Sequence, residues 1–389
     1  MATAILIILD GLGIGGAPDA ELYGDAGSDT LGNMSREVGG LNVPNLASLG
    51  LGNISSIHGV PASDAPKGVY GRLQEISEGK DSTTGHWELM GVITKVAFPT
   101  YPNGFPAELL QEFTKRTGYE VIGNKPASGT AIIKELGDQH LASGKLIVYT
   151  SGDSVFQIAA HDKVCDIDEL YRVCKIAREM LVKPHAIGRV IARPFTGDSG
   201  NYHRTPFRHD YSIHPPKEML LPTLKSAGVE ISSIGKIYDL YNGSGIDHSH
   251  TSLNNSEGMF NLERLYSEDR NKDRLLLLNL VDFDMLWGHR NDPHGMKKGL
   301  EEFDIWLGSF VDHLAEGDLL LMTADHGNDP TTPTTDHSRE HVPLLAYSGG
   351  LKSGSAIGVR QGFMDVGATI AEYFGCPAPI NGQSFYSHF

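Results

Sequence analysis

Short apolar segments that end directly in acidic residues constrain the fold of this chain more than any other feature. Residues 4–9 and 319–322 are continuous apolar runs of strand length, and residues 275–281 are apolar apart from Asn279, as is typical of strands buried on both faces of a parallel sheet. The carboxyl ends of such strands meet at one edge of an open α/β sheet, where ligands bind. We therefore predict an α/β fold whose mostly parallel sheet is flanked by helices and gathers acids at that edge. The acids are Asp10, Asp282, Asp284 and Asp325.

Histidines stand close to these acids in the chain. His326 follows Asp325 directly, His289 follows Asp284 by five residues, and a second Asp-His pair ends in His337. Carboxylate and imidazole ligands together suit zinc, manganese or iron better than calcium. A polar surface loop whose histidines cap turns is the alternative, but the convergence of three strand ends favours a metal centre for two ions about 3.5 to 4 Å apart. The predicted ligands are Asp10, Asp284, His289, Asp325, His326 and His337.

A run of hydroxyl side chains supplies a candidate nucleophile. Residues 79–91 read G-K-D-S-T-T-G-H-W-E-L-M-G, with Ser82, Thr83 and Thr84 between Asp81 and Gly85. A hydroxyl beside a metal pair loses its proton readily and can accept a phosphoryl group. The alternative is an N-cap cluster before a helix, which is compatible with this role because helix amino ends also favour phosphate.

Composition and charge exclude several classes of protein. Hydrophobic residues make up 40% of the 389 residues and charged residues 21%, as in ordinary globular proteins. The formal charge of −16 argues against nucleic-acid binding, and the three cysteines lack the C-x-x-C spacing of a thiolate zinc site. The Gly-rich residues 11–16 do not fit a dinucleotide loop. We find no membrane helix and no signal peptide, and expect a cytoplasmic protein without a membrane partner.

The middle of the chain has its own alternation of strands and helices. A helix is predicted from Pro106 to Gly118, a strand over 145–150, a helix over 167–181 and a strand over 188–195. This section, residues 97–216, is expected to be an inserted domain bounded by Pro215-Pro216. The remaining residues, 1–96 and 217–389, should form the metal-binding core. In that core we predict strands over 229–234 and 342–347 and helices over 296–314 and 368–373.

Several motifs together resemble one known family. They are Asp10, K-D-x-x-T-G-H-W-E at 80–88, G-N-K-P-A-S-G-T at 123–130, R-V-I-A-R-P-F at 189–195, D-F-D at 282–284 with His289, and T-A-D-H-G-N-D-P with Asp336-His337. This set is similar to that of the phosphopentomutases, which belong to the alkaline phosphatase superfamily. The likeness covers nearly the whole chain. It implies an alkaline-phosphatase-like core with an inserted α/β cap that binds substrate.

The resemblance also implies roles for individual residues. Two manganese ions are expected, although zinc and other divalent ions accept the same ligands. Ser82 is the implied nucleophile, where the family usually has threonine, and Thr83 and Thr84 are weaker candidates. One metal site would comprise Asp10, Asp325 and His326, and the other Asp284, His289 and His337. Ser151 and Asp153 of the cap would meet the ribose hydroxyls. Arg189 and Arg204 of the cap and Lys236 of the core would pair with phosphate oxygens. The alternative for each arginine is an ordinary surface ion pair.

These features lead to a functional hypothesis. We expect an isomerase that interconverts α-D-ribose 1-phosphate, or its 2-deoxy analogue, and the 5-phosphate through a phosphoserine and a 1,5-bisphosphate. A sugar bisphosphate is the implied activator that first phosphorylates the enzyme. A metal-dependent phosphomonoesterase and a cofactor-independent phosphoglycerate mutase are alternatives with the same metal ligands. A non-catalytic sugar-phosphate or metal-binding protein is disfavoured because binding does not require a poised hydroxyl. The sequence makes no prediction of the oligomeric state.

Overall fold

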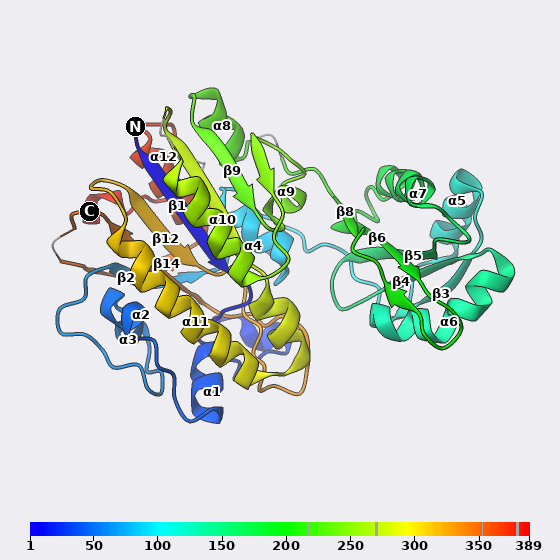
Figure 1. Ribbon diagram of the computed structural model, residues 1–389, viewed down its shortest axis with the longest axis horizontal. Helices are drawn as coiled ribbons and strands as arrows, with labels where there is room; N and C mark the ends of the chain where they lie inside the picture. The colour runs from blue at the N-terminus through cyan, green and yellow to red at the C-terminus, as the bar shows by residue number, and fades with distance from the viewer. Residues whose placement is uncertain (217, 269–270, 352, 379–380) are drawn as a thin grey trace. The chain divides into compact units, whose positions relative to one another are not determined.

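The computed structural model describes residues 1–216, 218–268, 271–351, 353–378 and 381–389. The chain divides into two compact units (Figure 1). One unit comprises Met1–Val96 and Pro215–Phe389, and the other comprises Ala97–His214. The second crossing between the units thus lies at 214/215, two residues before the boundary expected from the sequence.

The first unit is built on a mostly parallel sheet, which confirms the predicted α/β class. Within the described residues it has eight strands in the order β10-β9-β11-β1-β12-β13-β2-β14, and β13 runs antiparallel to both of its neighbours. The strands are β1 (Thr3–Leu9), β2 (Val69–Gln74), β9 (Glu230–Ile234), β10 (His248–His250), β11 (Arg274–Leu280), β12 (Leu319–Thr323), β13 (Val342–Ser348) and β14 (Ala356–Gln361).

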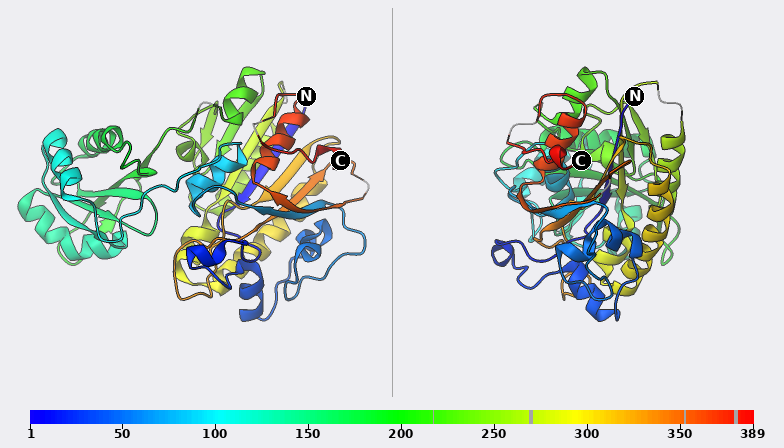
Figure 2. Two further views of the ribbon diagram at one scale, coloured as in Figure 1. Left: turned by 180° about the vertical axis from the view of Figure 1, so that it is seen from behind. Right: turned by 90° about the vertical axis from the view of Figure 1, so that its left-hand side faces the viewer.

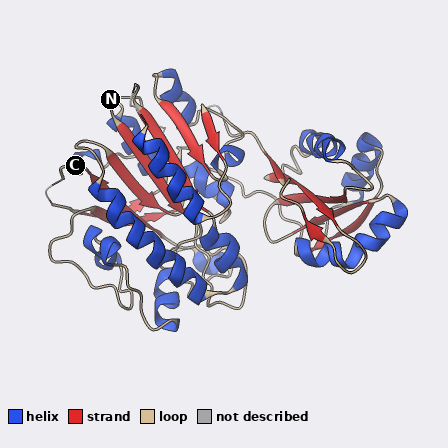
Figure 3. Ribbon diagram, in the orientation of Figure 1, coloured by secondary structure: helices blue, strands red, loops and turns tan. Residues whose placement is uncertain are grey.

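Helices cover both faces of this sheet. Figures 2 and 3 show α11 on one side of the strands and α12 on the other. The helices of this unit are α1 (Thr30–Glu37), α2 (Pro44–Leu49), α3 (Leu51–Ile54), α4 (Ser82–Leu89), α8 (Leu220–Ser226), α9 (Ile237–Leu240), α10 (Asn255–Ser267), α11 (Pro293–Asp312) and α12 (Met364–Tyr373). Short helical turns lie at Ala20–Tyr23, Phe283–Trp287, Gly288–Arg290 and Tyr386–His388.

The three apolar strands that end in acids lie side by side at the centre of the sheet. β1 pairs in parallel with β11 and with β12, and Leu9 stands opposite Leu280 while Ile8 stands opposite Thr323. Every residue of these strands is buried, which explains their largely apolar sequences; Asn279 in β11 is the polar residue within the segments predicted from the sequence. Because the strands are parallel and in register, their carboxyl ends reach the same edge, as predicted.

The second unit has its own sheet with helices on both faces. Its strands are β3 (Val121–Pro126), β4 (Leu146–Thr150), β5 (Val155–His161), β6 (Arg189–Thr196), β7 (His203–Arg204) and β8 (His209–Ser212), and its helices are α5 (Ala107–Thr117), α6 (Gly129–Ser143) and α7 (Ile167–Met180). One core packs α5 and α7 against Val148, Phe156 and Val190. A separate core packs α6 against Ile147, Tyr149 and Phe195.

The predicted elements of both units are present with small shifts at their ends. The largest is in α12, which starts at Met364 rather than 368. Helix α11 starts at Pro293 rather than 296 because Asp292 caps it and proline is favoured in the first turn. Helix α5 ends at Thr117, and Gly118, which was expected to close it, follows in a left-handed conformation. All three cysteines are free. In the part of the chain that the structure describes, no helix combines the length and apolar character needed to cross a membrane.

Candidate active site

Charged side chains follow four adjacent strands at one edge of the first sheet. Asp10 follows β1, Asp284 follows β11, and Asp325 with His326 follows β12. Lys236 follows β9, after Gly235, which has a positive φ of 84°. The acids are almost completely buried, with exposed fractions of 0% for Asp10 and Asp325 and 6% for Asp284. Burial of three carboxylates in one place requires compensating positive charge.

Two overlapping groups of side chains are close enough to hold metal ions. The first contains Asp10, Asp325 and His326, and the second contains Asp284, His326 and His337. In each group the ligand atoms lie within 4.8 Å of one another. His326 belongs to both groups, and its ring is 3.8 Å from the ring of His337. The structure therefore brings together five of the six predicted ligands in two triads.

His289, the sixth predicted ligand, lies beside the second triad. Its Nε2 is 3.2 Å from Asp284 Oδ2, and its ring stacks on His337 with centroids 4.9 Å apart. The opposite nitrogen, Nδ1, lies 2.6 Å from the Thr335 carbonyl oxygen, to which it donates a hydrogen bond that orients the ring. Asn328, which sequence analysis did not select, donates from Nδ2 to Asp284 Oδ1 at 2.7 Å.

The electrostatics of the cluster favour a divalent cation. Burial and then the Asp325 carboxylate raise the pKa of Asp10 to about 8. Lys236 Nζ forms an ion pair with Asp10, and this contact holds the pKa of Lys236 above its ordinary value although burial alone would lower it. One ammonium does not balance three carboxylates. Asp10 Oδ1 also receives no hydrogen bond from the described residues and is therefore available as a ligand. Carboxylate oxygens and imidazole nitrogens together suit transition-metal ions.

Ser82 is the first residue of α4 and lies next to this cluster. Its Oγ is 2.9 Å from Lys236 Nζ, which donates to it, and 3.2 Å from His326 Nε2. The Asp81 side chain caps the helix by accepting from the amides of Thr83 and Thr84, so capping and proximity to the cluster coexist. The Thr84 hydroxyl donates to Asp81 Oδ2 at 2.7 Å. Ser82 is therefore the hydroxyl of this run that contacts a candidate metal ligand.

Two further residues of α4 contact Asp325. His86 Nδ1 lies 3.1 Å from Asp325 Oδ2 and 2.9 Å from the Ser82 carbonyl oxygen. Since both neighbours are acceptors, Nδ1 carries the proton. A Cβ atom on Gly85 would lie 2.0 Å from the Asp325 carbonyl oxygen, so only glycine allows this approach. Sequence analysis noted G-H-W-E as a motif but assigned no role to Gly85 or His86.

The predicted substrate-binding residues of the second unit fall at the ends of β4, β6 and β7. Ser151 and Asp153 lie in the turn after β4. Arg189 Nη2 is 3.1 Å from Asp153 Oδ2, and its Nη1 is 3.6 Å from Asp210 Oδ2. Arg189 thus makes the ion pairs that were the alternative to phosphate binding. Arg204 has no carboxylate within 4.0 Å among the described residues.

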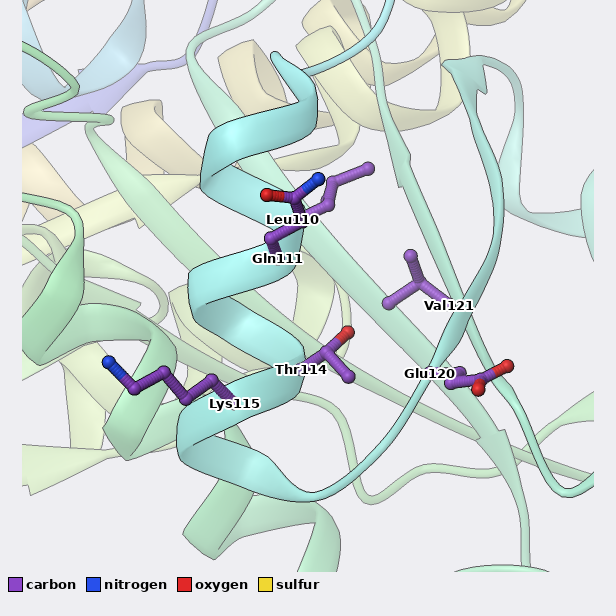
Figure 4. A pocket seen from close by; sticks show the side chains of 6 residues that line it. All are labelled: Leu110, Gln111, Thr114, Lys115, Glu120 and Val121. Atoms are coloured by element: carbon purple, nitrogen blue, oxygen red, sulfur yellow. The ribbon is translucent and has the colours of Figure 1, made fainter.

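A surface hollow elsewhere in the second unit contains none of the predicted site residues. It lies between α5 and the start of β3 (Figure 4). Its lining residues are Leu110, Gln111, Thr114, Lys115, Glu120 and Val121.

Comparison with known proteins gives the family of the chain. Residues 2–378 match the Metalloenzyme superfamily. The phosphopentomutase of Dictyoglomus turgidum is 54% identical over 385 residues, covering 99% of this chain and 97% of that protein, and the phosphopentomutase of Dictyoglomus thermophilum is 54% identical over 387 residues, covering 100% and 98%. The solved PH0037 protein from Pyrococcus horikoshii is 17% identical, with a TM-score of 0.48 and coverage of 96% and 97%. Given the identity over its full length, the chain belongs to the phosphopentomutase family of the Metalloenzyme superfamily.

Proposed function

We propose that this isomerase interconverts α-D-ribose 1-phosphate, or its 2-deoxy analogue, and the 5-phosphate through a phosphorylated Ser82. The position of Ser82 Oγ carries the proposal: it lies 2.9 Å from Lys236 Nζ and 3.2 Å from His326 Nε2. A hydroxyl between an ammonium group and a candidate metal ligand is activated as a nucleophile. Membership of the phosphopentomutase family supports this reaction.

The buried acids and imidazoles would hold the metal ions. We assign Asp10, Asp325 and His326 to one ion and Asp284, His289 and His337 to the other, with His326 close to both. Manganese is the proposed metal, and the ligand types also accept zinc. When bound, the ions supply positive charge that stabilises the Ser82 oxyanion and the transferring phosphoryl group.

The reaction then needs two phosphoryl transfers. In the first, the bond from Ser82 Oγ to phosphorus breaks as the free sugar hydroxyl attacks, which gives a 1,5-bisphosphate. In the second, Ser82 Oγ attacks the other phosphate and releases the isomerised monophosphate. The attacking sugar hydroxyl loses a proton in the first transfer. The sugar oxygen that is released from phosphorus gains a proton in the second, so the protons balance. Lys236 donates to Oγ throughout, and a sugar bisphosphate provides the first phosphoryl group.

The second unit supplies the remaining substrate contacts in this proposal. Residues 97–216 act as an inserted substrate-binding cap on a core formed by residues 1–96 and 217–389. Ser151 and Asp153 contact the ribose hydroxyls, whereas Arg189 and Arg204 pair with phosphate oxygens together with Lys236 of the core. Guanidinium groups match phosphate geometry because they donate two parallel hydrogen bonds. A cytoplasmic location remains a prediction from the sequence.

Mass spectrometry with an isomerase assay tests the proposal. The enzyme is incubated with manganese and a trace of ribose 1,5-bisphosphate, mapped for phosphate, and assayed with ribose 1-phosphate. We expect phosphate on Ser82 and formation of ribose 5-phosphate, both absent in Ser82→Ala and both retained in Thr83→Ala. Full isomerase activity in Ser82→Ala would refute the assignment of the nucleophile. Phosphate release without isomerisation indicates a phosphomonoesterase, and turnover of phosphoglycerates alone indicates the other mutase class.

A further inference from the structure

A small polar cradle lies at the amino end of α6, within the second unit. Ser128 caps this helix by accepting a hydrogen bond from the Ala131 amide at 3.3 Å. The amides of Gly129 and Thr130 precede Ala131 in the first turn and have no acceptor among the described residues. Free amides at the amino end of a helix attract anions because the helix dipole is positive there. The cradle belongs to the G-N-K-P-A-S-G-T motif at 123–130.

Tyr149 points its hydroxyl group into this cradle. The ring is buried in the core with Ile132 and Phe195, and the residue is only 1% exposed. Its hydroxyl has no hydrogen-bond partner in the described part of the chain. That hydroxyl lies 2.5 Å from the position that a Cβ atom on Gly129 would occupy. A buried hydroxyl without a partner destabilises the fold, so the free protein gains nothing from it.

Arg204 reaches the same point from β7. Its Nη2 lies 1.9 Å from the position of a Cβ atom on Gly129. The residue is exposed and has no carboxylate partner among the described residues, whereas Arg208 pairs with Asp210 at 2.7 Å. Arg193, close by on β6, adds a second positive charge, because burial and then Arg208 lower its pKa only to about 10. The cradle is thus locally cationic in a chain whose net charge is −16.

Glycine at position 129 allows two side chains to approach the helix end closely. A methyl group there would overlap both the Arg204 guanidinium and the Tyr149 hydroxyl. The groups that meet at this helix end are two amides, a phenol and a guanidinium, and all of them can donate hydrogen bonds. A phosphate monoester dianion offers the acceptor oxygens and the charge that this set requires.

We infer that the amino end of α6, together with Tyr149 Oη and Arg204, binds one phosphate group of the pentose phosphate. The identity of the ligand rests on the proposed function. Tyr149 and the amides of Gly129 and Thr130 are thereby added to the residues that recognise substrate. Tyr149 keeps its hydroxyl unpaired in the free enzyme because the ligand is its partner.

The first test replaces Tyr149 by phenylalanine in the full-length, manganese-loaded enzyme. Ribose 5-phosphate should bind about tenfold more weakly, as expected for loss of a hydrogen bond to a charged group. The melting temperature of the ligand-free variant should equal or exceed that of the wild type, because an unpaired buried hydroxyl is removed. Tyr171→Phe is the matched control. Its hydroxyl donates to the Phe207 carbonyl oxygen at 3.0 Å, so its loss should lower stability and leave binding unchanged.

A second variant tests the space at the helix end. Gly129→Ala should weaken binding of ribose 5-phosphate by about tenfold or more, because the methyl group would push the Arg204 guanidinium and the Tyr149 hydroxyl away from the helix end. Gln139→Ala, at an exposed position farther along α6, is the control and should bind as the wild type does. Calorimetric titration gives both affinities, and circular dichroism establishes that the variants are folded.

The outcomes separate this inference from the proposed function. Unchanged affinity for ribose 5-phosphate in Tyr149→Phe overturns the cradle, even if the wild type isomerises its substrate through phospho-Ser82. A different outcome is that the wild type binds ribose 5-phosphate without isomerase activity. If Tyr149→Phe and Gly129→Ala then bind ribose 5-phosphate more weakly than the wild type, the cradle stands and the proposed reaction fails.

Discussion

At the scale of single residues, Lys236 connects Ser82, the proposed nucleophile, to the acidic cluster. Its ammonium group donates to Ser82 Oγ and forms an ion pair with Asp10. It remains charged because, although burial would lower its pKa, Asp10 raises it. This positive charge has two opposite effects: it competes with a cation for Asp10, and it stabilises negative charge on Ser82 Oγ.

Substitution of Lys236 by methionine should separate these effects. We expect the affinity of the free enzyme for manganese to rise by about tenfold, since one positive charge beside the ligands is lost. Phosphorylation of Ser82 should slow by about a hundredfold or more, since its oxyanion loses a donor. Titration calorimetry and quenched-flow mass spectrometry measure the two quantities. Lys125→Met is the control, because Lys125 lies in the second unit and pairs with the exposed Glu135. A parallel fall in both quantities would contradict this account.

Glu340 should make stability depend on pH. Burial raises its pKa from 4.5 to about 7, and it accepts hydrogen bonds from Thr30 Oγ1 and Ser338 Oγ. Between these pH values the folded state binds a proton that the unfolded state has lost. Stability therefore falls as pH rises from about 4.5 to 7, by about 3 kcal/mol at most.

Substitution of Glu340 by glutamine removes this titration. The amide can donate to the hydroxyls of Thr30 and Ser338, which rotate to accept. In urea unfolding of metal-free protein from pH 5 to 8, the free energy of unfolding should decline for the wild type and decline less for Glu340→Gln. Equal slopes for the two proteins would rule out Glu340 as the source.

At the scale of the element, α4 differs from an ordinary surface helix. All eight of its residues are buried, and several of their polar groups have internal partners. Trp87 Nε1 donates to the Leu240 carbonyl oxygen at 3.0 Å, and the Glu88 carboxylate accepts from the amides of Ser77 and Phe363. These hydrogen bonds fix the position of the helix. The helix in turn places Ser82 at its amino end and His86 next to Asp325. Its role is to position these groups rather than to cover the sheet.

Two variants of His86 should distinguish positioning from packing. His86→Phe removes the polar contact between His86 Nδ1 and Asp325 Oδ2 and should weaken manganese binding by about 10- to 100-fold. His86→Asn places an amide nitrogen near the former Nδ1 and should recover most of that affinity. Manganese titration followed by electron paramagnetic resonance measures both. Equal losses in the two variants would mean that His86 acts through packing alone.

At the scale of the whole molecule, the predicted metal ligands lie in one of two units that have separate sheets. Each has its own sheet, and the second unit has its own hydrophobic cores around Phe156 and Phe195. All six predicted metal ligands lie in the first unit. Metal binding should therefore stabilise one unit and leave the other unchanged.

Calorimetry with and without a chelator tests this division. We expect two thermal transitions and a downward shift of only one on metal removal, equivalent to about 4 kcal/mol if free metal had been at a thousand times its Kd. Ile158→Ala, in the core of the second unit, should lower the other transition. A single transition that responds to both changes would show that the units unfold together.

Much of the fold and most of the candidate site could be predicted from the sequence. Apolar segments of strand length predict buried parallel strands. Acids directly after such segments lie at the sheet edge, because parallel strands in register end at the same edge. Pro106 and Gly118 mark the ends of α5 for equally local reasons, the restricted φ of proline and the left-handed cap. These conclusions need only neighbouring residues.

The sequence by itself therefore determined the central strands of the first sheet, the acidic edge and the set of candidate ligands. Only the tertiary structure decided that His326 is shared by two triads, that His86 contacts Asp325, and that Lys236 donates to Ser82. It alone brought Tyr149 and Arg204 to the end of α6 beside Gly129. The physical reason is the range of the interactions. Local patterns set backbone conformation and burial, whereas contacts between residues far apart in the chain depend on how whole elements pack.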